Sequence, residues 1–443
     1  MMLGSDRAGA VSTQAAVVDV APARTAPRRV FAGAGLLSGA MVGSGVLAYA
    51  FFVLAARTLG PDAYGQIGVL WAGMFIGVIV LFRPLEQTTT RAVAERLAHG
   101  AEIKTVVRSV ALVYAGVLVL GAAAAAATWE TITSRLFLGS NLLTAMLFAG
   151  TAVYGLEYML RGVMAGAQWF RGYALCLTAD AVARVAVAVP LVVVASKDLA
   201  ATAIAAAGFG GFVVPLWAGR RRLGALVHAG HGERFDIGAA VTFAAPASAI
   251  AAADQVLINA GPLLVMVEGG KHASATAGVV FAATMLVRIP VYVFQGVAAS
   301  LLPSLTRLHV AADVALFRRA LERAAVVLVG TTGVILLAAA TVGPAGMGAV
   351  YGSAFHADRV ALALLGLGVG FYLGAATLSQ ASLALDRGRQ AALAWTTSAV
   401  CFLGFYFVVP GGQLMRIAIS FSIGTGVCCA LVAGGLAGRI RRR

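Results

Sequence analysis

The sequence predicts an all-α polytopic membrane protein, with about twelve transmembrane helices in two six-helix bundles around a central cavity. Hydrophobic residues make up 60% of the 443 residues and charged residues only 12%, and the mean hydropathy is +0.90. A soluble fold could not bury this much apolar surface. Runs of about 20 apolar residues, long enough to cross the hydrocarbon core, recur along the chain, and most Lys and Arg residues lie between them.

Twelve such runs form two sets of six. The first set covers residues 30–56, 65–82, 106–128, 142–160, 173–195 and 199–219. The second set covers residues 237–267, 277–302, 324–342, 360–385, 391–409 and 417–438. Each run is apolar on every face instead of alternating, which indicates helices and not barrel strands.

These runs predict the domain organisation. We expect an N-terminal bundle at residues 30–219 and a C-terminal bundle at 237–438, joined by a basic cytoplasmic linker at 220–236 that contacts anionic membrane lipids. The Ala- and Pro-rich residues 1–29 predict a disordered cytoplasmic tail, and residues 439–443 a basic cytoplasmic tail. The first run exceeds a signal-peptide core, so we interpret it as a membrane span.

The distribution of Lys and Arg predicts the orientation. With the N-terminus inside, 25 of these residues fall on the cytoplasmic side, and the opposite side receives only Arg57, Arg135, Lys197, Lys271, Arg359 and Arg416. Because positive charge accumulates in cytoplasmic loops, we expect a multi-pass protein of the bacterial inner membrane with both termini in the cytoplasm. Despite the net charge of +15, no nucleic-acid partner is expected, because the basic residues do not gather on one face with aromatic residues.

The two halves resemble each other at an offset of roughly 210 residues. Tyr64 and Gly65 follow a short outer loop and lead into an apolar run, as do Ala277 and Gly278 in the second half. Copies of six helices have the same orientation in the membrane, which is typical of transporters with a substrate site between the halves. The alternative is chance similarity among hydrophobic helices.

Two stretches carry a resemblance to a known family. The loop at residues 57–65, RTLGPDAYG, looks like the R-x-L-G-x-x-x-Y-G loop after the first helix of O-antigen flippase-like proteins. Residues 288–305, which begin with RIP and end with LLPSL, are similar to the eighth helix of the multidrug/oligosaccharidyl-lipid/polysaccharide exporter superfamily, which includes the lipid II flippase.

The resemblance implies a flippase that moves a polyprenyl-(pyro)phosphate-linked glycan, a cell-envelope polysaccharide precursor, across the membrane by alternating access. Lipid II flippases usually carry fourteen helices and charged residues in the first helix, and drug exporters often carry a carboxylate there. Residues 30–56, the first predicted helix, contain no charged residue and therefore no carboxylate. The polysaccharide branch therefore fits best.

Charged residues inside the spans are the candidate site residues, because such charges are costly in a bilayer. Arg288 lies about ten residues into the eighth run, just before Pro290, and its planar guanidinium suits a phosphate. The alternative is an arginine neutralised by a carboxylate elsewhere in the bundle.

Two further pairs have helical spacing. Asp180 and Arg184 are four residues apart and can form either a structural ion pair or a substrate site in the cavity. Glu157 and Arg161 repeat the spacing near a span end, where Arg161 can extend to the headgroups.

Asp254, followed by Gln255 and Asn259, forms a polar stripe in the seventh run. A buried carboxylate suits proton coupling, but Asp254 could equally pair with Arg288. We expect proton or sodium coupling through Asp254, Asp180 and Glu157, whereas Arg57 and Arg83 are expected to anchor to headgroups.

Other function classes lack support in the sequence. No nucleotide-binding P-loop and no catalytic constellation is present, and the four cysteines show no metal-ligand spacing. We therefore expect neither an enzyme nor a cofactor. The remaining alternatives are a multidrug or small-cation exporter, which would want an electronegative cavity, and a non-transporting cell-wall scaffold, which would tolerate loss of every buried charge.

Overall fold

The computed structural model describes residues 27–227, 237–270, 272–291, 314–385 and 387–440, and within these ranges it contains helices and no strands. Ten of the described helices are long and apolar enough to cross a membrane, and α7 (Ala273–Val287) is a shorter apolar helix. The prediction of an all-α, multi-pass membrane protein is confirmed.

The N-terminal half consists of five long helices and one short 3-10 helix. They are α1 (Pro27–Ala98), α2 (Lys104–Leu136), α3 (Asn141–Gly166), α4 (Phe170–Ala188), η1 (Val189–Val192) and α5 (Lys197–Val227). The first two predicted spans both lie in α1, so these elements contain all six spans of the first set.

The reversal between the first two spans takes place at a single residue. Gly60 has φ 72° and ψ 173° inside α1, a conformation that glycine adopts without steric cost, and Pro61 then suits the first turn of the next segment. The two segments lie side by side, since the rings of Phe52 and Trp71 are 4.7 Å apart. The predicted nine-residue loop at 57–65 was therefore wrong: the residues on either side of Gly60 are helical.

The C-terminal half contains α6 (Ile237–Glu268), α7, α9 (Val314–Thr341), α10 (Gly343–Tyr351), α11 (Arg359–Ala384), α12 (Gly388–Val408) and α13 (Gln413–Ile440). The short helix α10 was not predicted. The eighth predicted span is described as far as Val291, and its remainder lies outside the described residues.

The predicted terminal and linker segments are only partly described. Residues 1–26, 228–236 and 441–443 lie outside the described residues. Helix α1 begins at Pro27, within the predicted tail, and α5 continues to Val227. The basic residues 220–222 are therefore helical, which corrects the prediction of a linker that begins at 220.

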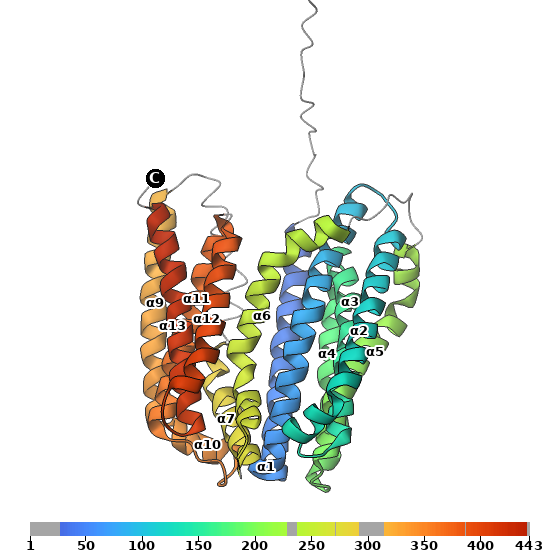
Figure 1. Ribbon diagram of the computed structural model, residues 1–443. Helices are drawn as coiled ribbons and strands as arrows, with labels where there is room; N and C mark the ends of the chain where they lie inside the picture. Colours follow the sequence, from blue (N-terminus) through green and yellow to red (C-terminus); the bar gives the residue numbers. More distant parts are fainter. Residues whose placement is uncertain (1–26, 228–236, 271, 292–313, 386, 441–443) are drawn as a thin grey trace, which may run out of the picture.

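The helices pack mainly within each half. In the N-terminal half α3 contacts α1 and α5, and α4 contacts α5; in the C-terminal half α13 contacts α11 and α12, and α9 contacts α11. The halves meet where α1 contacts α6 and α7, at the centre of the molecule in Figure 1. This interface is where a site between the halves must be sought.

Candidate functional site between the two halves

At the Gly60 end, the two halves touch through glycines. A Cβ atom at Gly65 would collide with the Ser274 backbone carbonyl, and one at Gly278 would collide with the carbonyl of Pro61. The Ser274 hydroxyl also donates a hydrogen bond of 2.6 Å to the Asp62 carbonyl. Only a residue without a side chain permits this approach, and we call it the Gly65–Gly278 contact.

Aromatic rings fill the space beside this contact. The Tyr64 ring is fully buried and lies 5.5 Å from Phe281 and 5.5 Å from Phe355. Phe281 also meets Phe52 at 5.2 Å. The side chain of Arg57 donates to the Val350 and Ala349 carbonyls at the end of α10, instead of extending freely toward headgroups.

The Gly65–Gly278 contact bears on the predicted repeat. Gly65 and Gly278 were matched because each starts an apolar span, and the structure brings the two together across the interface. Backbone contact and aromatic packing therefore hold the halves together at the end that the charge distribution predicts to be extracellular.

Arg288 lies deeper, at the end of α7. It lies 15 residues after Ala273, the first residue of α7. At 1.5 Å per helical residue, Arg288 is therefore about 22 Å along the helix from the start of α7. Its Nη1 donates to the Ile258 carbonyl at 3.3 Å and to Asn259 Oδ1 at 3.4 Å. Its buried Nε has no hydrogen-bond partner, and among the described residues no carboxylate forms an ion pair with this guanidinium.

Asp254 lies on α6 at a similar depth. It is 14 residues before Glu268, where α6 ends, which is about 21 Å along the helix. Its Oδ1 accepts a 2.6 Å hydrogen bond from the Tyr372 hydroxyl, and its Oδ2 accepts one of 3.0 Å from Gln255 Nε2. Asp254 and Arg288 are electrostatic neighbours, yet uncharged groups satisfy the carboxylate.

In the N-terminal half, Arg184 and Asp180 form the predicted ion pair. Arg184 Nη2 lies 2.9 Å from Asp180 Oδ2, and the Tyr154 hydroxyl accepts from Arg184 at 2.8 Å and donates to Asp180 at 2.7 Å. The guanidinium also lies 5.0 Å from the centre of the Trp71 ring. Arg184 is only 2% exposed, so its charge is enclosed within this half.

Glu157 and Arg161 belong to a second network. Arg161 Nη1 is 3.7 Å from Glu157 Oε1, and its Nε is 3.5 Å from Glu86 Oε1. Tyr173 accepts from Arg161 at 2.7 Å and donates to Glu86 at 2.8 Å. Glu157 is 1% exposed, and its Oε2, which packs against Gly211, has no hydrogen-bond partner.

Three of these partners were missed by sequence reasoning. Glu86 follows the second predicted span and was not singled out, but α1 continues to Ala98 and keeps Glu86 in the bundle. Tyr154 lies three residues before Glu157, and Tyr372 lies on a distant helix. Each of the three lies on a different helix from the charged group that it contacts, so nothing in the sequence connects them.

The basic residue Arg83 lies on α1, in the N-terminal half. It is exposed and is an electrostatic neighbour of Asp254 on α6 and of Tyr158 on α3. Arg83 and Arg288 belong to opposite halves, and the positive charges of both act on the Asp254 carboxylate.

Comparison of the sequence with family models finds no match. An uncharacterized protein from Mycobacterium tuberculosis is 29% identical over 397 residues, which cover 88% of this chain and 86% of the relative.

Two solved structures have the same arrangement of helices. The inward-facing conformation of a multidrug resistance MATE family transporter of the MOP superfamily matches with a TM-score of 0.70 at 16% identity, over 90% of this chain and 94% of that chain. A MOP superfamily transporter from Pyrococcus furiosus, described as having a binding pocket of reversed polarity, matches with a TM-score of 0.63 at 16% identity, over 92% of this chain and 95% of that one. The chain therefore has the fold of the MATE transporters of the MOP superfamily.

Proposed function

We propose that this protein is an inner-membrane flippase that translocates a polyprenyl-phosphate- or pyrophosphate-linked saccharide by alternating access between its two halves. The anionic phosphate would bind at Arg288, while the polyprenyl chain stays in the bilayer. The closed Gly65–Gly278 contact fits a state that opens only at the opposite end, like the inward-facing MATE structure.

The observation that carries this proposal is the environment of Arg288. A guanidinium at mid-depth is costly unless an anion or water accompanies it. Arg161 and Arg184 have carboxylate partners, whereas Arg288 contacts only a carbonyl and an amide in the described residues. A phosphate would supply the missing negative charge through strong, charge-assisted hydrogen bonds.

Carboxylates would supply the coupling. Asp254 is an electrostatic neighbour of Arg288 and Arg83, so uptake of a proton or sodium ion there would change how strongly the arginines attract an anion. Glu157, with one oxygen unpaired, and Asp180 are the corresponding groups of the N-terminal half.

A multidrug or small-cation exporter is the second candidate, because a MATE multidrug transporter shares the fold and Asp254 could attract a cation. The two functions require opposite responses at one position. Removal of the Arg288 charge should abolish transport of an anionic cargo, but it should preserve or improve transport of a cation.

The test uses the full chain in proteoliposomes with two probes, a fluorescent polyprenyl-pyrophosphate-linked disaccharide and the cationic dye ethidium. We expect Arg288→Ala to lower translocation of the disaccharide lipid at least tenfold, and Arg288→Lys to restore part of it. Arg108→Ala is the matched control, because Arg108 is exposed on α2. Unchanged disaccharide translocation in Arg288→Ala, or transport of ethidium alone, would refute the flippase proposal.

A further inference from the structure

A groove on the outer side of the C-terminal half is separate from the site between the halves. It has a volume of about 640 Å³ and lies between α9 and α13, with α11 as its floor. Its lining is almost entirely apolar, and we call it the α9–α13 groove. It is lined by Glu322, Ala324, Ala325, Leu328, Val329, Thr332, Gly370, Phe371, Gly374, Thr377, Leu378, Cys429, Ala433, Leu436 and Ala437.

The groove runs along the half of the bundle that lies away from the Gly60 end. Glu322 and Ala437 lie near its mouth, close to the start of α9 and the end of α13. Thr332 lies ten residues further along α9, which is about 15 Å. A groove of this length and volume within membrane-spanning helices can hold an acyl chain of one leaflet.

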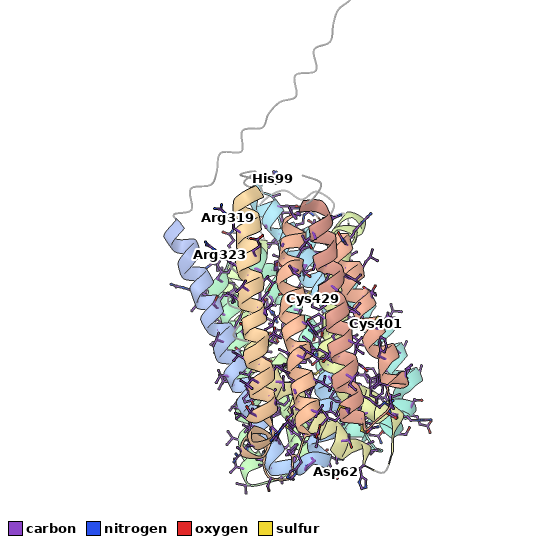
Figure 2. All side chains as sticks on the ribbon, turned by 90° about the vertical axis from the view of Figure 1, so that its left-hand side faces the viewer. Asp62, His99, Arg319, Arg323, Cys401 and Cys429 are labelled. Atoms are coloured by element: carbon purple, nitrogen blue, oxygen red, sulfur yellow. The ribbon has the colours of Figure 1, made fainter. Side chains whose placement is uncertain are left out.

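The mouth of the groove is positively charged. Arg319 and Arg323 are exposed on α9 next to the groove-lining Glu322, and Figure 2 shows both arginines at the end of α9, with Cys429 further down the same face. Two cations therefore lie at the mouth of an apolar groove whose one acidic lining residue is Glu322.

From this charge complementarity we infer that the α9–α13 groove binds an anionic phospholipid of the adjacent leaflet. The acyl chain lies in the groove against α11, and the phosphate lies beside Arg319 and Arg323. Basic residues at the headgroup level attract anionic lipids, and the apolar lining replaces the neighbouring lipid chains.

A membrane phospholipid fits this groove better than the polyprenyl chain of the proposed cargo. All lining residues come from α9, α11 and α13, whereas the halves meet at α1, α6 and α7. Cys429, which lines the groove, lies on the face turned to the viewer in Figure 2, the side of the C-terminal half that is turned away from the N-terminal half in Figure 1. A cargo with its phosphate at Arg288 would not have its tail on this face.

The experiment is native mass spectrometry of the purified full chain with phosphatidylglycerol or phosphatidylcholine of identical acyl chains. We expect the parent protein to bind phosphatidylglycerol more tightly than phosphatidylcholine. In the double variant Arg319→Gln/Arg323→Gln, the affinity for phosphatidylglycerol should fall about fivefold for each arginine that is removed. Phosphatidylcholine affinity should not change in this variant. Ala433→Phe, which fills the groove, should lower the occupancy of both lipids.

Matched controls separate the groove from general lipid contact. Arg108→Gln removes an exposed arginine of α2, and Leu431→Phe enlarges an exposed side chain of α13 that does not line the groove, so neither should change lipid binding. Equal affinity for both lipids, or binding in Ala433→Phe equal to the parent, would overturn the inference. A polyprenyl phosphate that outcompetes phosphatidylglycerol at equal concentration would also overturn it and assign the groove to the cargo.

Discussion

In the N-terminal half, every buried arginine described above has a carboxylate within its own half: Arg184 has Asp180, and Arg161 has Glu86 and Glu157. In the C-terminal half, Arg288 and Asp254 lie at similar depth but contact uncharged groups. Both halves are helical, and they differ in how their charges are satisfied. Under the proposed function, the difference teaches that paired charges stabilise the bundle, while separated charges are left to bind a cargo.

The largest expected effect is the loss of one partner from the Asp180–Arg184 pair. Arg184→Leu leaves the Asp180 carboxylate buried without its cation, which should lower the free energy of unfolding by about 3–5 kcal/mol. Asp180→Leu/Arg184→Leu removes both charges and should recover most of this loss. Thermal unfolding of the purified variants in detergent measures both changes. If Arg184→Leu were as stable as the parent, the Asp180–Arg184 pair would not be structural. The difference between paired charges in the N-terminal half and separated charges in the C-terminal half would then lose its meaning.

A smaller effect is expected at the Gly65–Gly278 contact. Gly65→Val places a side chain against the Ser274 carbonyl, and overpacking of this kind typically costs about 1–3 kcal/mol. Because the clash lies between the halves, it should separate them at this end. Labelling of Ser274→Cys by a membrane-impermeant thiol reagent, in a chain without its four native cysteines, should rise severalfold.

The control for the glycine variant is Gly121→Val on α2, because nothing lies within 4 Å of a Cβ atom at Gly121. This variant should label like the parent. If Gly65→Val also labels like the parent, the contact does not close this end.

The smallest change in stability is expected for Arg288→Leu. The substitution removes long hydrogen bonds of 3.3 and 3.4 Å and no ion pair among the described residues, so we expect the free energy of unfolding to change by about 1 kcal/mol or less. The same thermal unfolding assay checks this value. A loss as large as that of Arg184→Leu would place Arg288 in a structural role.

Hydrophobicity alone predicted most of the fold. The apolar runs located the long helices, because a bilayer demands about 20 apolar residues for each crossing. Several helices extend beyond their runs, as α1 does to Ala98 and as α9 does from Val314. The reversal after the first span was predicted, but as a nine-residue loop at 57–65, because the sequence does not show that Gly60 alone, with its positive φ, makes the turn. The short α10 was missed because it continues the apolar character of α9.

The candidate site was only partly predictable. Pairs on one helix, such as Asp180 and Arg184, follow from i,i+4 spacing. Contacts between distant helices, such as Tyr372 with Asp254 or Glu86 with Arg161, depend on tertiary packing that one sequence does not reveal. The roles of Arg288, Arg184, Asp254, Asp180 and Glu157 in cargo binding or coupling stay predictions.

The most direct test of the account is ligand-dependent stability of the parent and Arg288→Leu. Polyprenyl pyrophosphate is added to each purified protein in nanodiscs, and the thermal unfolding midpoint is measured. A ligand that binds the folded state stabilises by about 2.7 kcal/mol at a hundredfold excess over Kd, so the midpoint of the parent should rise by several degrees while that of Arg288→Leu stays constant. Equal stabilisation of both proteins would contradict the assignment of Arg288 to an anionic cargo.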